Sequence, residues 1–149
     1  MEFYWKYFLH KKSYAYRAED VLLLTMSKSF WKREGFYVDV GASHPVKNSN
    51  SYVFYSQGWS GLNIDCRREA IALFEKFRPR DINVTAAVSD KEEEVSMYGW
   101  GVGELTTIDS ARASSMGAPE MVRRIQTQKL STILDQYLPK NQTIDFFEY

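Results

Sequence analysis

The sequence predicts an α/β fold in which a sheet of mainly parallel strands is flanked by helices. Short apolar runs of strand-forming residues, such as Phe36–Val40 and residues 61–65, alternate with segments of helical periodicity. This alternation is what a parallel sheet with right-handed crossover helices requires. Both runs also carry an aspartate at or near their end. Because ligands bind at the carboxyl ends of the strands in such sheets, we expect the binding site there.

Length and composition limit the other classes. The chain has 149 residues, of which 44% are hydrophobic and 15% aromatic, which is enough for one domain with a real core. Its 19 basic and 19 acidic residues balance, so we expect no nucleic acid and no other polyanion as a partner. Cys66 is the only cysteine, which excludes an internal disulfide. With two histidines far apart in sequence, no metal site is expected.

Residues 1–17 form an N-terminal aromatic and basic segment ahead of a domain that we place at residues 18–149. The segment is too short and too charged to be transmembrane, and it lacks the cleavage site of a signal peptide. We therefore expect no transmembrane segment and a cytoplasmic protein. Two roles for the segment stay open, packing against its own domain or docking to a membrane surface or a partner.

The first predicted helix spans residues 18–33, with apolar residues at helical spacing and Glu19 and Asp20 in its first turn, where the helix dipole favours them. The strand Phe36–Val40 follows and breaks at Gly41, which lets the chain turn and leaves N–H groups to face a bound group. No GxGxxG motif and no Walker lysine accompany this turn, so it is not built to hold a pyrophosphate.

A short helix at 51–57, stopped by Gly58, leads to the second strand at 61–65. The next helix, at 67–77, ends before Pro79. The predicted buried face of this helix consists of Ala70, Ile71, Phe74 and Phe77. Acidic residues are interspersed among the nearby arginines, which indicates a solvated surface for Arg67, Arg68, Arg78 and Arg80. Residues 82–88 form a near-continuous apolar run, which predicts a third strand buried on both faces.

The pattern changes after Asp90. Residues 94–98 alternate as an exposed or edge strand does, and 99–119 has no firm periodicity, which indicates a lid, an acceptor-binding loop or disorder. Met121–Gln128 predicts a strand and is followed by a helix that Ser131 can cap. The apolar face of this helix consists of Ile133, Leu134, Tyr137 and Leu138. Residues 143–149 predict a fourth parallel strand.

Ordered blocks of the chain resemble the FkbM-type methyltransferases, which are class I enzymes that use S-adenosylmethionine. The resemblance runs from Glu19 and Asp20 to the last residue, and the blocks are FYVDVGASHP at 36–45, SNSY at 49–52, GWSGLNID at 58–65, RPRDIN at 78–83 and AVSD at 87–90. It implies a Rossmann-like class I methyltransferase sheet. In the family the fourth strand continues into an Asp-Val-Glu-Gly turn and further strands, so this chain resembles a version truncated after the fourth strand.

The residues and the resemblance together give a set of candidate site residues. Asp65 follows Asp39 at about the offset at which an acid ending the second strand reaches a ribose. The full set for S-adenosylmethionine is Asp39 (loop fixing, or the methionine ammonium through water), Gly41, Ala42 and Ser43 (close backbone approach), Asn50, Asp65 (ribose), Cys66, and Val88 and Ser89 (adenine). Asn50 either binds the amino-acid end or caps the helix after it. No catalytic residue is assigned; His44 is a weak candidate for the base and is more often structural at such a turn.

The resemblance implies O-methylation of a sugar or natural-product hydroxyl, with a small-molecule or glycan acceptor. One alternative is a non-catalytic remnant that binds an adenosine ligand or a partner chain. Another enzyme on the same fold, such as a nucleotide-sugar transferase or a dehydrogenase, is disfavoured by the missing phosphate loop. We also expect Phe146 and Phe147 on the unpaired flank of the fourth strand to be partly uncovered, which favours self-association or marginal stability.

Overall fold

The computed structural model describes residues 12–26, 34–101 and 105–149. Its first part consists of α2 (Glu19–Met26), β1 (Phe36–Val40), α3 (Tyr52–Ser56), β2 (Ser60–Asp65), α4 (Arg68–Phe77) and β3 (Ile82–Thr85). Its second part consists of β4 (Ala87–Val88), β5 (Glu94–Trp100), β6 (Leu105–Thr107), α5 (Ser110–Ser115), β7 (Met121–Gln128), α6 (Leu130–Tyr137) and β8 (Phe146–Glu148). Residues 1–11 of the N-terminal segment predicted at 1–17, and residues 27–33 of the first predicted helix, lie outside the described residues.

A four-stranded parallel sheet with the order β3-β2-β1-β8 forms the centre of the fold. Val38 of β1 pairs with Leu62 of β2 on one side and with Phe147 of β8 on the other. The chain therefore builds β1, β2 and β3 outward in one direction and returns to the opposite flank of β1 for β8. This reversal is the topological switch point at which sheets of this kind bind ligands. The predicted α/β class is confirmed, and the arrangement is compatible with a Rossmann-like fold.

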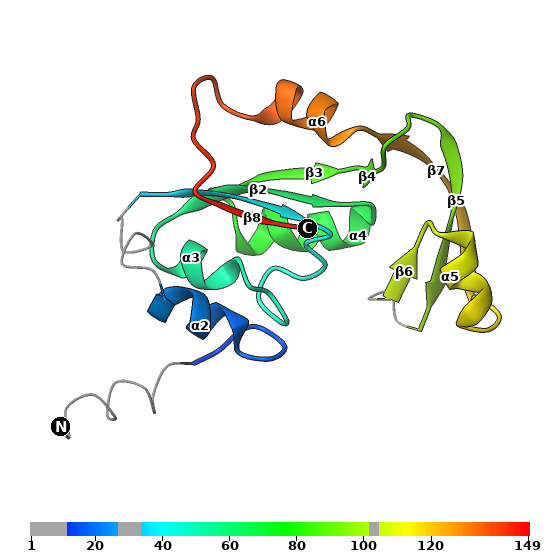
Figure 1. Cartoon of the computed structure of the whole chain (residues 1–149), viewed down its shortest axis with the longest axis horizontal. Helices are drawn as coiled ribbons and strands as arrows, with labels where there is room; N and C mark the ends of the chain where they lie inside the picture. Colours follow the sequence, from blue (N-terminus) through cyan, green and yellow to red (C-terminus); the bar gives the residue numbers. More distant parts are fainter. Residues whose placement is uncertain (1–11, 27–33, 102–104) are drawn as a thin grey trace.

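Alternation along the strands assigns each side chain to one face of the sheet. Helix α6 covers one face, and α3 and α4 cover the other (Figure 1). The α6 face is apolar and includes Phe36, Val38, Leu62, Ile64 and Ile133. On the opposite face Tyr37, Phe54 and Trp59 form a second cluster. Polar residues of β1 and β2, such as Asp39 and Asn63, lie on that second face, and this fixes where the polar site can form.

The helices follow the predicted periodicity, with local corrections. Ala70, Ile71 and Phe74 of α4 are buried, but Phe77 is 50% exposed because the chain turns away after it. Helix α6 packs its predicted apolar face on the sheet. Its N-cap is Lys129, so the prediction that Ser131 caps it was wrong; Ser131 already lies in the helix.

The predicted third strand divides into two at Ala86. Strand β3 pairs with β2, whereas β4 pairs with β7 in a second sheet. The Ala86 N–H donates to the Asp65 carbonyl at 3.0 Å, which holds the divided strand close to the end of β2. Thr85 is exposed, so burial of this run on both faces was a wrong prediction. The division carries the chain from the first sheet to the second.

The second sheet has the order β4-β7-β5-β6. Strand β7 has the predicted bounds and pairs antiparallel with β5 from Glu94↔Gln126 to Gly99↔Met121. An exposed or edge strand was predicted at 94–98; β5 pairs with β6 only from Tyr98 to Trp100, so among the described strands residues 94–97 pair with β7 alone. The region 99–119 holds β6 and α5, and disorder was therefore a wrong prediction for its described part. The Asp109 side chain caps α5 by accepting from the N–H groups of Ala111 and Arg112.

Strand β8 confirms the predicted fourth parallel strand and is shorter than predicted. Phe147 is 45% exposed, as expected, whereas Phe146 is half-buried and packs on Phe54 with ring centroids 4.8 Å apart. Among the described helices, none is long and apolar enough to cross a membrane.

Gly61 gives the first testable prediction. A Cβ at this position would lie 2.1 Å from Cε2 of Tyr37, whose buried ring is held by the hydrogen bond from its hydroxyl to Asp81. We expect Gly61→Ala to lower the free energy of unfolding by about 1–3 kcal/mol, measured by urea denaturation, because the ring has no room to move. Gly99→Ala is the matched control, since its Cβ would meet the flexible end of Met121 at 2.8 Å. Equal losses in both variants would contradict this account of the packing.

Candidate functional site

A pocket of about 420 Å³ lies at the carboxyl ends of β1 and β2, within the size range of small-molecule sites. One wall comes from the first sheet and the chain that follows its strands: Val40, Gly41, Ser43, Ile64, Asp65, Cys66, Arg67, Ala86, Ala87, Val88 and Tyr149. The other wall comes from β6, α5 and the turn between them: Thr106, Thr107, Ile108 and Arg112. The pocket thus lies between the two sheets.

The structure brings some of the predicted site residues to this pocket and places the others elsewhere. Those lining it are Gly41, Ser43, Asp65, Cys66 and Val88, and those absent from its lining are Asp39, Ala42, His44, Asn50 and Ser89. Asp39 and Asp65 lie on the same face and at the same end of the sheet, as a shared nucleoside site requires. Asp39 pairs with Asn63 of the parallel strand β2, and Asp65 lies two residues further along, so its side chain points to the same face.

The Gly41 turn is closed onto β2. Gly41 has φ +78°, and its N–H and that of Ala42 both donate to the Ile64 carbonyl, at 2.8 and 3.1 Å. The Ser43 N–H donates to Oδ2 of Asp65 at 2.9 Å. The prediction that these N–H groups face a bound group was therefore wrong, since all three hold the loop. A side chain at Gly41 would have nothing within 4 Å, so the pocket side of this turn is open.

Asp65 is 5% exposed and is saturated with donors. Its Oδ1 accepts from N and Nε of Arg67 at 2.8 and 3.0 Å, and its Oδ2 accepts from Ser43 N and from Nη2 of Arg67 at 3.1 Å. A carboxylate offers about four lone-pair sites, and these contacts use them. Arg67 also donates to the Ser43 carbonyl at 3.2 Å. Assigning Arg67 to a solvated surface was wrong, since it is 9% exposed and clamps the pocket wall.

Asp39 is buried and does not line the pocket. It is 4% exposed and accepts a hydrogen bond from the Ser51 hydroxyl. Burial, followed by the nearby charge of Glu148, raises the pKa of Asp39 to about 7, against its ordinary value of 3.8. The hydrogen bond from Ser51 and the charge of Arg78 offset part of that rise in pKa. Of the two predicted roles, the contact with Ser51 corresponds to loop fixing.

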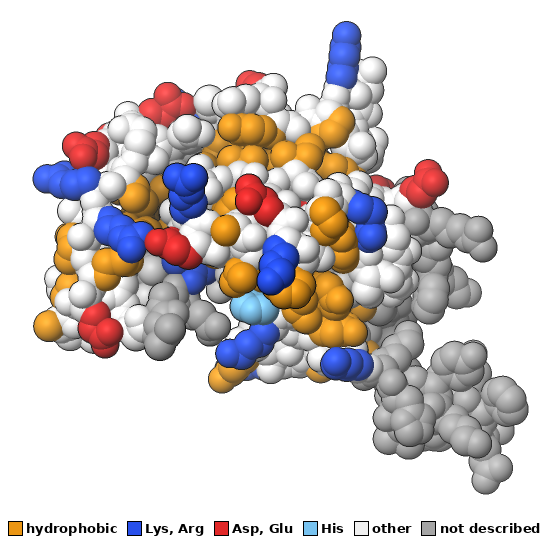
Figure 2. All heavy atoms as spheres, turned by 180° about the vertical axis from the view of Figure 1, so that it is seen from behind, with side chains coloured by type: hydrophobic (Ala, Val, Ile, Leu, Met, Phe, Trp, Pro, Cys, Tyr) orange, Lys and Arg blue, Asp and Glu red, His pale blue; other side chains and the backbone are white. Residues whose placement is uncertain are grey.

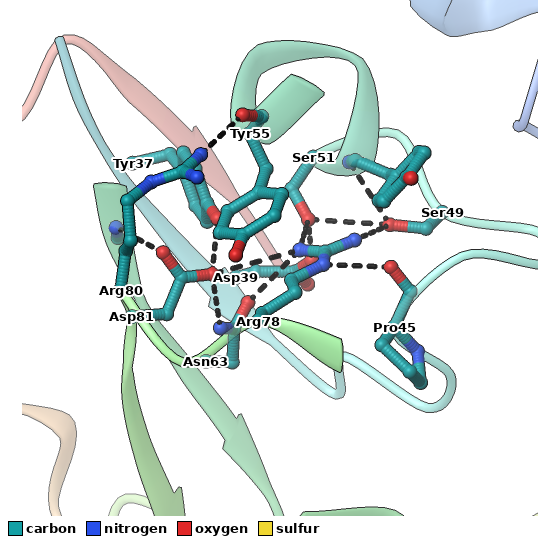
Figure 3. Close-up of polar contacts among 12 residues, drawn as sticks. Tyr37, Asp39, Pro45, Ser49, Ser51, Tyr55, Asn63, Arg78, Arg80 and Asp81 are labelled. Carbon is teal, nitrogen blue, oxygen red and sulfur yellow. Dashed lines mark hydrogen bonds and ion pairs between the residues drawn. The ribbon is translucent and has the colours of Figure 1, made fainter. Parts of the chain in front are cut away.

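Arg78 organises the residues around Asp39 (Figure 3). Its side chain is 0% exposed, and all its donors point at the loop after β1 or at β2. The hydrogen bonds are Nε to the Pro45 carbonyl at 2.6 Å, Nη1 to Ser51 Oγ at 2.9 Å and to Asn63 Oδ1 at 3.3 Å, and Nη2 to Ser49 Oγ at 2.7 Å. Predicting a solvated surface for Arg78 was wrong.

Aromatic rings surround the Arg78 guanidinium. Its Cζ lies 4.9 Å from the Phe74 ring centroid, 5.3 Å from Tyr52 and 5.7 Å from Tyr55. Asp81 provides the nearest carboxylate, at 4.0 Å from Nη1. Flat faces and neutral acceptors around a delocalised cation are what guanidinium tolerates in an interior. Sequence reasoning missed this role because nothing in the run RPRD distinguishes a buried arginine from an exposed one.

Asn50 and Glu148 meet at the switch point between β1 and β8. Asn50 Nδ2 donates to Glu148 Oε1 at 2.6 Å, while the first N–H of α3, that of Tyr52, is accepted by Ser49 Oγ at 3.2 Å. The alternative that Asn50 caps α3 was therefore wrong. Within the described part of the chain, Asn50 Oδ1 and Glu148 Oε2 are buried without a hydrogen-bond partner. Burial raises the pKa of Glu148 above its usual value.

The remaining candidates are structural in this geometry. His44 Nδ1 accepts from the N–H groups of Val46 at 3.1 Å and Lys47 at 3.0 Å, which is the role expected at a turn. Cys66 lies 3.4 Å from Met97 Sδ, and burial raises the pKa of its thiol, which favours the protonated form. The Ser89 N–H donates to the Gln128 carbonyl at 3.0 Å, which turns this residue toward β7.

Figure 2 shows both basic and acidic side chains on the face drawn. Among residues 12–26, 34–101 and 105–149, no group of three or more His, Cys, Asp or Glu side chains could hold a metal ion. Recognition at this site therefore depends on the local charges of the pocket.

Comparison of the chain with protein-family models gave no match, and comparison with curated proteins and with solved structures gave none either. The function must therefore be argued from the pocket and its residues. The resemblance to FkbM-type enzymes rests on the sequence blocks alone.

The raised pKa of Asp39 predicts a pH dependence of stability. Because the folded state holds the proton more tightly than the unfolded state, the stability present at pH 4 is lost progressively as the pH rises toward 7. Asp39→Asn removes this titration and keeps an acceptor for Ser51. We expect urea denaturation to show the variant gaining stability relative to wild type from pH 4 to 7 and then levelling off.

Asp90→Asn, at an exposed position, is the control and should run parallel to wild type over this range. If the Asp39→Asn curve is parallel as well, Asp39 is not a buried carboxyl of raised pKa.

Proposed function

We propose that the chain provides the cofactor-binding sheet of an S-adenosylmethionine-dependent class I methyltransferase of the FkbM type. The acceptor we propose is a hydroxyl of a sugar or natural product. The observation that carries the proposal is the pocket of about 420 Å³ at the carboxyl ends of β1 and β2, next to the reversal of strand order at β8. This is where Rossmann-like sheets bind nucleosides.

The first wall has the residue types that a nucleoside site needs, apolar residues for the base and a carboxylate for the ribose. Ala86, Ala87 and Val88 offer an apolar surface for a base, and Asp65 stands at the end of β2, where a ribose would bind. The open side of Gly41 leaves room for a ligand to approach the backbone. One rearrangement is needed: because Arg67 and Ser43 fill the acceptor sites of Asp65, the ribose hydroxyls can bind only if Arg67 releases part of the carboxylate.

The bound cofactor would supply a methyl group on a sulfonium, which an acceptor oxygen takes as the C–S bond breaks to a neutral thioether and the hydroxyl proton passes to a base or to solvent. The chain's own task is to position the two partners, which is the main source of rate in such a reaction. Asp65 is engaged in its ion pair with Arg67, and burial raises the pKa of the Cys66 thiol, so neither of these described lining residues is singled out as the base. No catalytic base is therefore assigned.

A second candidate is a non-catalytic module that binds a partner chain. It is favoured by the outer edge of β8, where Phe147 is 45% and Tyr149 is 87% exposed. An unpaired parallel strand with exposed aromatic residues can take up another strand. Ligand binding in the pocket separates this candidate from the first.

Calorimetry with S-adenosylhomocysteine tests the proposal. We expect saturable binding to the wild-type chain and a loss of at least about tenfold, or about 1.4 kcal/mol, in Asp65→Ala. Arg67→Ala should retain or strengthen binding, because it frees Asp65 for the ribose. His44→Ala serves as the control and should bind as wild type does, since His44 does not line the pocket.

The absence of binding at millimolar ligand would reject the proposal. Equal losses in Asp65→Ala and Arg67→Ala would show that the pair only supports the loop and that no ribose is bound there.

A further inference from the structure

Building on the proposed function, we infer that the second wall of the pocket binds an anionic group of the methyl acceptor, a carboxylate or a phosphate. Arg112 is the residue that recognises this group. The inference identifies the chemical class of the acceptor, which the first wall leaves open. It rests on the charges that line the pocket, on the hydroxyl groups beside Arg112 and on the way α5 is fixed.

The charges of the pocket do not cancel. Three charged side chains line it: Asp65, Arg67 and Arg112. Asp65 and Arg67 neutralise each other through a pair with Nε and Oδ1 at 3.0 Å. For Arg112 no ion pair is found among the described residues, in contrast to Arg123 of β7, which pairs with Glu69 at 2.8 Å. Among the described lining residues, the side-chain charges therefore leave one net positive charge, and it comes from the second wall.

Two hydroxyl-bearing residues belong to the same pocket wall as Arg112. Thr106 and Thr107 of β6 line the same wall and are half-buried. Thr107 Oγ1 accepts from the Asp109 N–H at 3.1 Å, so its own O–H remains a donor. A guanidinium with neighbouring hydroxyl donors is the usual combination for a carboxylate or phosphate, because it offers several N–H and O–H groups to one anion.

The backbone of Arg112 is fixed before any ligand arrives. Asp109 Oδ1 accepts from the N–H groups of Ala111 at 2.8 Å and Arg112 at 3.2 Å, which anchors the first turn of α5. Ala113 is buried beneath this turn at 5% exposure. Arg112 itself is exposed, so its guanidinium stays hydrated until an anion replaces the water. A neutral acceptor would offer no such exchange.

The position of Arg112 assigns the anion to the acceptor and not to the nucleoside. The apolar residues Ala86, Ala87 and Val88, together with Asp65, belong to the first wall, and Arg112 belongs to the wall that faces them. A nucleoside on the first wall would leave the second wall to the group that receives the methyl.

The test uses inorganic phosphate and acetate as probes with the whole chain at low ionic strength, followed by amide chemical shifts. We expect saturable shifts around β6 and α5 with wild type, and at least about tenfold weaker binding in Arg112→Gln. Arg124→Gln is the matched control, since Arg124 is also an exposed arginine of the second sheet but does not line the pocket, and it should bind as wild type does. If phosphate binds more strongly than acetate, the anionic group is a phosphate, and the reverse order indicates a carboxylate.

Unchanged probe binding in Arg112→Gln, or the lack of saturable shifts in wild type, would overturn the inference. Binding of S-adenosylhomocysteine to the wild-type chain, measured in parallel, separates the two proposals. If the probe depends on Arg112 and the nucleoside does not bind, the anion site stands and the proposed function fails. If the nucleoside binds and Arg112→Gln leaves the probe affinity unchanged, only the anion site is rejected.

Discussion

The buried guanidinium of Arg78 is the interaction on which the site depends. It ties Pro45, Ser49 and Ser51, in the segment after β1, to Asn63 in the middle of β2. A charge at 0% exposure is costly to bury, so it persists only where its donors are matched, and here each nitrogen has an acceptor within 3.3 Å. Apolar side chains of similar volume could fill this space with equal or greater stability. It specifies one path for the loop, and the pocket lies above that path.

Helix α4 carries an arginine next to each end, and both reach the same loop. Arg67, the N-cap residue, donates to the Ser43 carbonyl, and Arg78, the C-cap residue, donates to the Pro45 carbonyl. Of the predicted acid pair, only Asp65 is hydrogen-bonded by one of these arginines. Asp65 is held by Arg67 in the pocket wall, while Asp39 is held by Ser51 and does not line the pocket. The two aspartates that look equivalent in the sequence thus have different environments, and only Asp65 can meet a ligand directly.

Much of the fold followed from sequence periodicity, because an apolar run such as Phe36–Val40 or the pattern of α6 depends on its own residues. That the last segment forms a parallel strand also followed from this pattern, whereas its pairing with β1 comes from the structure. The errors arose where distant partners decide the outcome. The division at Ala86 depends on the pairing of β4 with β7, and the burial of Arg67 and Arg78 depends on carbonyls of a loop far away in sequence. For the second wall, a lid, an acceptor-binding loop or disorder was predicted at 99–119, but its lining residues were not named because β6 and α5 carry weak local signals.

The most direct test of this account is the free energy of unfolding of Arg78→Lys, measured by urea denaturation. Lysine keeps the charge and most of the stem but cannot offer a planar fork to Pro45, Ser49, Ser51 and Asn63 at once. The account predicts a loss of at least about 2 kcal/mol, because buried acceptors lose their donors. Arg124→Lys at an exposed position should stay within about 0.5 kcal/mol of wild type. An Arg78→Lys variant as stable as that control would contradict the claim that Arg78 holds the site together.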